Sequence, residues 1–92
     1  MSKRLTEKVV VVTGAAMGIG RATALAAAKE GVIVAVCDVN ETEGKETVDE
    51  IRRSGGNARF YLLDVSSEPQ VRTVFSKIGE ELGDMYGLVN SV

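Results

Sequence analysis

Hydrophobic residues along the chain follow two alternating patterns. Short apolar runs, typical of strands buried on both faces of a sheet, alternate with longer segments where apolar residues recur at helical spacing. The runs that predict strands are Val9–Val12, Val32–Cys37, Ala58–Leu63 and Gly87–Val89. The segments that predict helices are Ile19–Lys29, 41–53 and Val71–Leu82. The predicted order is therefore β-α-β-α-β-α-β.

The first predicted helix is rich in alanine. Its Ala22, Leu25 and Ala26 predict a flat face of small side chains that lies close to a sheet, and Gly31 ends the helix. The other two helices begin with residues at capping-box spacing, Asn40 with Glu43 and Ser67 with Gln70. Their predicted inward-facing residues are Val48 and Ile51 in the second helix and Val71, Val74, Phe75, Ile78 and Leu82 in the third.

Strands that alternate with helices through short connections predict a parallel sheet with right-handed crossovers. Placing the strands outward from one to three and then crossing back gives the order 3-2-1-4. We therefore predict one α/β domain over residues 1–92, a doubly wound Rossmann-type sheet that is truncated after its fourth strand.

Three glycines lie in the turn between the first strand and the first helix. Gly14 allows a sharp reversal, Gly18 lets the backbone approach a ligand, and Gly20 lets the helix pack close to its strand. The helix that follows directs unpaired N–H groups and a positive dipole end at the turn, which favours a phosphate. The turn predicts a dinucleotide pyrophosphate site, and the alternative is a glycine-rich turn without a ligand.

Polar residues follow the strands at the edge where such sheets bind ligands. Asp38 ends the second strand at about the separation from the glycines expected of an acid that hydrogen-bonds an adenosine ribose. The alternative for Asp38 is a cap or turn residue before the next helix. Asp64 follows the third strand, and its alternative is a helix-dipole residue ahead of Ser66 and Ser67.

Asp38 also predicts NAD rather than NADP as the cofactor. A 2′-phosphate beside this carboxylate would meet a repulsion of about 4 kcal/mol per charge pair at about 4 Å and an effective dielectric constant of about 20. Met17, Val39 and Asn40 supply no cation to offset it, and Arg21 lies on the helix beyond the turn.

With Thr13 in front, the glycine spacing T-G-x-x-x-G-x-G resembles the signature of the short-chain dehydrogenase/reductase family. Asp64-Val65 is similar to that family's pair at the end of strand three, where the Asp contacts the adenine amino group. Leu88-Val89-Asn90 resembles the start of its L-V-N-N-A-G segment, from which Ser91 and Val92 depart. The cofactor-binding residues that we predict are Gly14, Ala16, Met17, Gly18, Ile19, Asp38, Val39, Asp64, Val65 and Asn90.

The resemblance covers the NAD-binding N-terminal half of such an enzyme. It implies hydride transfer between NAD and an alcohol or carbonyl substrate in the full-length parent, using a Ser, an Asn and a Tyr-x-x-x-Lys pair. Tyr61 is followed four residues on by Val65 and Tyr86 by Asn90, so neither matches that pair. We therefore predict no catalytic residue in this chain and no activity of the chain alone.

Composition narrows the possible partners. A net charge of −2 gives no basic field for nucleic acid, and no apolar run is long enough to cross a membrane. The chain lacks a signal-peptide pattern, which favours a cytoplasmic protein. The single Cys37 is predicted to be a buried core thiol, and the absence of histidine leaves no ordinary ligand set for a transition metal.

One helix would cover the second face of the predicted sheet, and strand four would have an unpaired edge. Both features predict a homodimer or larger homo-oligomer. Two alternatives to a cofactor-binding half-enzyme remain: a half-enzyme completed in trans by another chain, and a non-enzymatic Rossmann-like association module.

Overall fold

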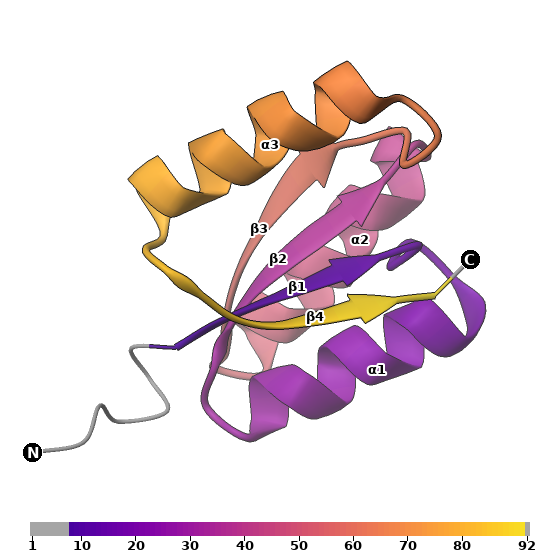
Figure 1. The fold of residues 1–92 in the computed structure, drawn as a ribbon. Helices are drawn as coiled ribbons and strands as arrows, with labels where there is room; N and C mark the ends of the chain where they lie inside the picture. Colours follow the sequence, from indigo (N-terminus) through magenta and orange to yellow (C-terminus); the bar gives the residue numbers. More distant parts are fainter. Residues whose placement is uncertain (1–7, 92) are drawn as a thin grey trace, which may run out of the picture.

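The structure, a computed structural model, describes residues 8–91. Within them the order of elements is the predicted one (Figure 1). The elements are β1 (Val9–Thr13), α1 (Gly18–Lys29), β2 (Ile33–Asp38), α2 (Glu41–Arg53), β3 (Asn57–Leu62), α3 (Glu68–Glu81) and β4 (Met85–Asn90). Predicted and observed bounds differ mostly by one residue, although α3 and β4 begin earlier than predicted, at Glu68 and Met85.

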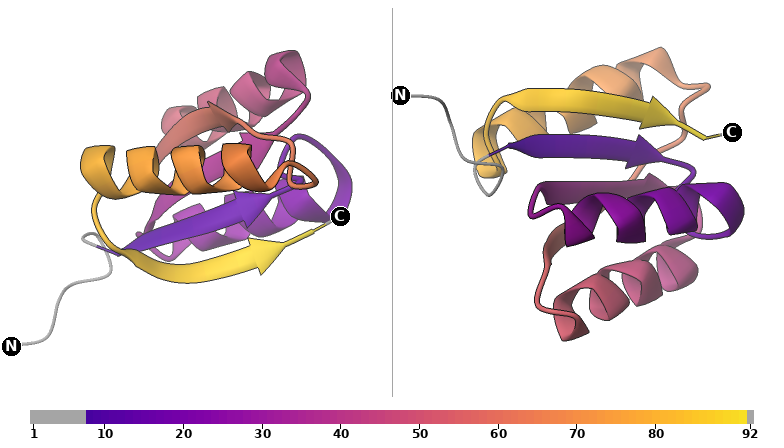
Figure 2. Two further views of the ribbon diagram at one scale, coloured as in Figure 1. Left: turned by 45° about the horizontal axis from the view of Figure 1, so that its top comes forward. Right: turned by 90° about the horizontal axis from the view of Figure 1, so that it is seen from below.

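The four strands form one parallel sheet in the order β3-β2-β1-β4, which confirms the predicted fold class. Val11 in β1 pairs with Ala35 in β2 and with Leu88 in β4. Figure 2 shows α1 and α2 on one face of the sheet and α3 on the other. All four strands point the same way, so the loops that follow them leave from a single edge (Figure 1).

A hydrophobic core lies on each face of the sheet. On the α1 and α2 side the fully or nearly buried residues are Val12, Ala15, Ala24, Val32, Val34, Val36, Val48, Ile51 and Ala58. On the α3 side they are Val9, Val11, Ala35, Cys37, Tyr61, Leu63 and Ile78, with Val71, Val74, Phe75 and Leu82 packed against them. The inward-facing stripes predicted for α2 and α3 are confirmed.

The face predicted for α1 is wrong in part. Ala22 and Ala26 are exposed, and the residues that face the sheet are Gly20 and Ala24, with Leu25, Ala27 and Ala28 partly buried beside them. A Cβ added at Gly20 would overlap the carbonyl oxygen of Gly14, so this glycine does allow the close packing that was predicted for it.

One of the two predicted helix caps forms. The side-chain oxygen of Asn40 accepts from the N–H of Glu43 at 3.1 Å. Ser67 occupies the N-cap position of α3, but its side chain makes no capping bond, so the predicted Ser67–Gln70 box is wrong. Gln70 turns back instead, and its side-chain oxygen accepts from the N–H of Asp64 at 3.1 Å.

The surface around β4 is more open than the rest of the sheet. Met85 and Leu88 lie on the α3 side of β4, and both are about half exposed. Among the described residues β4 pairs only with β1, so its other edge carries unpaired backbone groups. Tyr86 also lies on β4, and the ammonium of Lys8 lies 4.0 Å from the centre of its ring. None of the described helices is long and apolar enough to span a membrane.

Candidate functional site

The carboxyl ends of β1, β2, β3 and β4 surround a cavity of about 260 Å³. Its lining is Gly14, Asp38, Val39, Leu63, Asp64, Val65 and Ser91. Five of these, Gly14, Asp38, Val39, Asp64 and Val65, belong to the residues predicted to bind the cofactor. Leu63 and Ser91 were not predicted, although each directly neighbours a predicted residue at a strand end.

Asn90 lines an adjoining cavity of about 210 Å³ that shares Leu63 and Val65 with the first. The side-chain oxygen of Asn90 accepts from the hydroxyl of Thr13 at 2.7 Å. This bond ties the end of β4 to the end of β1, and both of its residues line the second cavity. Val92, at the end of the predicted segment, lies outside the described residues.

The glycine turn is closed on one side and open on the other. Gly14 has a φ of +67°, and an added Cβ would overlap the carbonyl oxygen of Ser91. Gly18 has a φ of +63°, and nothing lies within 4 Å of the place where its Cβ would be. Both glycines therefore adopt a backbone conformation that side chains disfavour, but only at Gly18 would an added Cβ meet free space.

The start of α1 faces that free space with unpaired donors. The amides of Met17, Gly18 and Ile19 have no hydrogen-bond acceptor among the described residues, as expected for the first turn of a helix. The side chains of Met17 and Ile19 are 60% and 80% exposed, and no acidic residue lies in this turn. These groups and the helix dipole together favour an anion.

The preceding residues of the turn are fixed by bonds within the fold. The N–H of Ala15 donates to the carbonyl of Cys37 at 3.2 Å, and the N–H of Ala16 donates to Oδ2 of Asp38 at 3.0 Å. Ala16 was predicted to contact the cofactor, but its amide is already bonded. The donors left for a ligand begin at Met17.

Asp38 is both a turn residue and a lining residue of the cavity. Its Oδ1 accepts from the N–H of Asn40 at 2.9 Å, while Oδ2 accepts from Ala16. A carboxylate oxygen has two acceptor sites, so each oxygen keeps one for a further donor such as a hydroxyl. The two interpretations of Asp38 from sequence are therefore compatible.

Asp64 organises the loop between β3 and α3. Its Oδ1 accepts from the N–H of Ser66 at 3.0 Å and from the Ser66 hydroxyl at 2.6 Å. The hydroxyl bond, followed by the N–H bond, lowers the pKa of Asp64 below its ordinary value. Asp64 is thus an ionised acceptor at the cavity at neutral pH.

The Arg21 side chain is bonded to α2. Its Nη1 donates to the hydroxyl of Thr47 at 3.2 Å, and its Nη2 pairs with the carboxylate of Glu50. Both partners lie on α2, so the guanidinium bridges the two helices, and Arg21 does not line the cavity. Its charge is neutralised there.

Known proteins resemble this chain in sequence and in structure. The sequence profile of the family described as short chain dehydrogenase matches residues 8–92. The chain belongs to the short-chain dehydrogenase family. Among its relatives in this family, the uncharacterized oxidoreductase YxbG of Bacillus subtilis is 44% identical over 88 residues, which are 96% of this chain and 32% of the relative. A 3beta-hydroxysteroid dehydrogenase of Mediterraneibacter gnavus is 41% identical over the same shares of the two chains.

A solved short-chain dehydrogenase structure shows the same fold. The crystal structure of a hydroxysteroid dehydrogenase from Escherichia coli superposes with a TM-score of 0.90 at 36% identity, covering 95% of this chain and 37% of that one. The present chain therefore spans about a third of the length of the relatives that it matches. In the present chain, the carboxyl edge of the sheet holds most of the residues that the sequence predicts to bind the cofactor.

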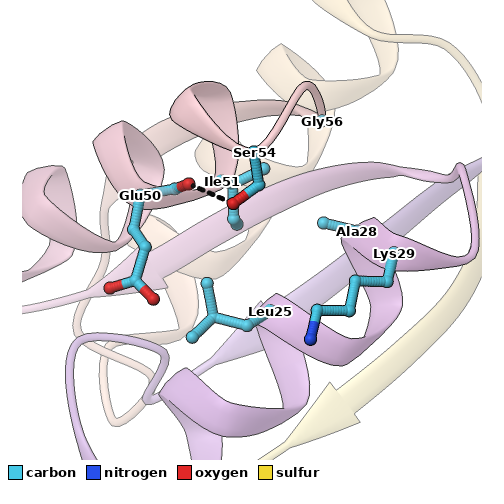
Figure 3. Close-up of a pocket in the computed structure, with 7 residues that line it drawn as sticks. All are labelled: Leu25, Ala28, Lys29, Glu50, Ile51, Ser54 and Gly56. Carbon is cyan, nitrogen blue, oxygen red and sulfur yellow. Dashed lines mark hydrogen bonds between the residues drawn. The ribbon is translucent and has the colours of Figure 1, made fainter.

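A further cavity of about 170 Å³ lies between α1 and α2, away from the glycine turn (Figure 3). It is lined by Leu25, Ala28, Lys29, Glu50, Ile51, Ser54 and Gly56, from the later turns of both helices and the connection that follows α2. The hydroxyl of Ser54 donates to the backbone carbonyl of Glu50 at 3.1 Å, so this hydroxyl is already bonded within the fold. None of the residues predicted from the sequence to bind a cofactor lies here.

Proposed function

We propose that the chain is the NAD-binding part of an oxidoreductase of the short-chain dehydrogenase family. The observation that carries this proposal is the set of unpaired amides at the start of α1, beside the open side of Gly18 and next to the Asp38 cavity. A cradle of this kind accommodates a diphosphate, because the N–H groups and the helix dipole both favour negative charge.

The predicted residues other than Ala16 then divide the binding of the cofactor among them. The amides of Met17, Gly18 and Ile19 hold the diphosphate, and the carboxylate of Asp38 accepts from the hydroxyls of the adenosine ribose. Asp64 accepts from the adenine amino group, while Val39 and Val65 supply apolar contact to the base. The Gly14 turn and Asn90 border the route towards the nicotinamide end.

NAD is preferred over NADP for two reasons that the side chains support. Asp38 brings a carboxylate to the cavity, where a 2′-phosphate would be repelled. Arg21, the basic residue nearest to the turn in sequence, is engaged by Thr47 and Glu50 and leaves that phosphate without a partner.

Hydride transfer between NAD and an alcohol or carbonyl belongs to the full enzyme in this proposal. The nicotinamide supplies the hydride chemistry, and residues 8–91 hold and orient the cofactor's adenosine and diphosphate. Tyr61 is buried and its hydroxyl donates to Glu81 at 2.8 Å, away from the cavity, so it does not serve as the proton donor. The cytoplasmic location inferred from the sequence stays a prediction.

Self-association is a second property that we propose, and the exposed surface of β4 favours it. Met85 and Leu88 present apolar side chains beside a strand edge whose backbone groups are unpaired among the described residues. Pairing of two β4 edges would satisfy those groups and bury the apolar surface.

The cofactor proposal is tested by titrating the protein with NAD and NADP in a calorimeter. We expect NAD to bind at least about tenfold more tightly than NADP, and Asp38→Ala to weaken NAD while narrowing that preference. Asp49→Ala removes the same charge from an exposed position on α2 and should leave both affinities unchanged. Failure of the wild-type protein to bind NAD at millimolar concentration would overturn the proposal.

A further inference from the structure

Thr47 is a fully buried polar residue in the middle of α2, with 0% of its surface exposed. Its hydroxyl lies 3.1 Å from the carbonyl oxygen of Ala15 and 3.5 Å from that of Ala16. These carbonyls belong to the glycine turn, which is far from Thr47 in sequence. A third carbonyl, that of Glu43 in the preceding turn of α2, lies at 3.2 Å.

The Thr47 hydroxyl is the one donor to the Ala15 carbonyl among residues 8–91. Ala15 is itself fully buried, so water does not replace that donor. A hydroxyl has one proton, and the Ala15 carbonyl is the nearest of its three possible acceptors. The hydroxyl therefore links the underside of the turn to α2.

Arg21 sets the direction in which this hydroxyl donates. Its Nη1 donates to the Thr47 oxygen at 3.2 Å, so the hydroxyl proton points away from Arg21 and towards the carbonyls. Glu50 holds Arg21 in turn through an ion pair. The resulting chain of bonds runs from Glu50 through Arg21 and Thr47 to the turn.

We propose that Thr47 is a positioning residue for diphosphate binding, acting through the backbone of Ala15 and Ala16. Asp38 and Cys37 hold the amides of these two residues from β2, and the Thr47 hydroxyl holds the carbonyl of Ala15 from α2. The peptide between Ala15 and Ala16 is thereby held on both sides, and this orients the amides that follow it, those of Met17, Gly18 and Ile19. This inference rests on the proposed function, since it assigns the residue that shapes the same site.

The test compares ADP with adenosine, because only ADP carries the diphosphate that the turn would hold. Thr47→Val keeps the shape of the side chain and removes the hydroxyl. We expect this variant to bind ADP about tenfold more weakly and adenosine less than about twofold more weakly. Thr47→Ser should restore the affinity for ADP. Amide chemical shifts of Gly18 and Ile19, followed by NMR during titration, report binding in the folded population alone.

Two further variants separate positioning from general destabilisation. Thr23→Val removes another hydroxyl that bonds a backbone carbonyl, that of Ile19 at 2.8 Å, without a bond to Ala15 or Ala16, and should leave ADP affinity unchanged. Glu50→Gln removes the ion pair that holds Arg21, at the partly exposed end of the chain of bonds. We expect this variant to bind ADP about threefold more weakly. Because loss of a negative charge favours an anion, a weaker affinity in this variant reports changed geometry.

The outcomes distinguish this inference from the proposal on which it rests. Wild-type protein that binds neither ADP nor NAD overturns the proposed function. Wild-type protein that binds ADP, with Thr47→Val and Glu50→Gln binding it equally well, overturns the role of Thr47 and leaves the proposed function standing. An equal loss of ADP and adenosine affinity in Thr47→Val also overturns it, because that result indicates a structural role only.

Discussion

At the scale of single residues, Gly14 and Gly18 adopt nearly the same left-handed backbone, with φ of +67° and +63°. Their surroundings differ, because a side chain at Gly14 would overlap the backbone of Ser91 while one at Gly18 would enter open space. The same substitution at the two positions therefore separates a packing role from a binding role.

We expect Gly18→Ala to lower the free energy of unfolding by about 1–2 kcal/mol, the usual penalty for a left-handed residue with a side chain. Gly14→Ala should lower the free energy of unfolding by about 1–3 kcal/mol more than Gly18→Ala does, because the Ser91 backbone would have to move. Urea unfolding followed by circular dichroism measures both. Gly55 has a φ of +88° and no neighbour within 4 Å of an added Cβ, so Gly55→Ala is the control that measures the penalty of the left-handed backbone alone.

Ligand affinity completes this comparison. Gly18→Ala should remain folded and lose NAD affinity, since its new methyl group occupies the space beside the free amides. Gly55→Ala should bind NAD like the wild type. Unchanged NAD affinity in a folded Gly18→Ala variant would contradict the assignment of this turn as the diphosphate site.

Cys37 is the buried thiol that the sequence predicted, and its environment disfavours the thiolate. Burial, with a smaller contribution from the negative charge of Asp38, raises its pKa from 9.0 to about 12. A group whose pKa is raised by folding adds stability that is complete below pH 9.0 and is lost as the pH rises towards about 12.

We therefore expect the wild-type protein to lose stability between pH 9.0 and about 12 more steeply than Cys37→Ala does. Burial and the bond to Glu81 also raise the pKa of Tyr61 to about 12, but both proteins keep that residue, so the difference isolates the thiol. Urea unfolding at a series of pH values measures this difference. Parallel pH profiles for the two proteins would contradict it.

The sequence predicted which residues line the cavities at the strand ends, because parallel strands bring those ends to one edge. Asp38, Asp64 and Asn90 were predicted in this way. Thr47 was not predicted, since it directly follows Glu46 in a helix rich in charged residues and reads as part of a polar face. Its contact with Ala15 depends on how α2 packs against the turn, and one sequence carries no signal of that packing.

At the scale of elements, the two capping positions offer a direct comparison. The Asn40 side chain accepts from Glu43, whereas the Ser67 side chain makes no capping bond. We expect Asn40→Ala to lower the free energy of unfolding by about 1 kcal/mol and Ser67→Ala by less than about 0.5 kcal/mol. Thermal unfolding of the two variants beside the wild type measures this, and equal losses would contradict the assignment.

The faces of the helices were predictable only where apolar and polar residues contrast. In α3 the large apolar residues form one stripe, and the predicted face is the observed one. In α1 alanines occur on every side, so Ala22 and Ala26 could not be told apart from Ala24 and Ala27. What decides the inward face there is the close approach of Gly20 to the turn, a property of the tertiary fold.

At the scale of the whole molecule, the strand order followed from few constraints. Short β-α connections require parallel strands, and the handedness of the crossovers puts α1 and α2 on one face and α3 on the other. The same constraints leave β4 at an edge of the described sheet. The position of the open surface beside that edge was thus predictable from the sequence. The structure adds that Met85 and Leu88 form this surface and are about half exposed.

This surface leads to a prediction about assembly. If two copies associate through β4, a charge at Leu88 must be buried without a partner, which is unfavourable. We expect Leu88→Lys to raise the dissociation constant of the dimer at least about tenfold, as measured by sedimentation velocity over a range of micromolar concentrations. Leu62→Lys places the same charge on the opposite edge strand, β3, at a residue that is 57% exposed against 50% for Leu88, and should leave the dimer intact. A wild-type protein that is monomeric at these concentrations would contradict this prediction. Equal effects of the two substitutions would also contradict it, because only Leu88 lies on the strand through which the copies are proposed to pair.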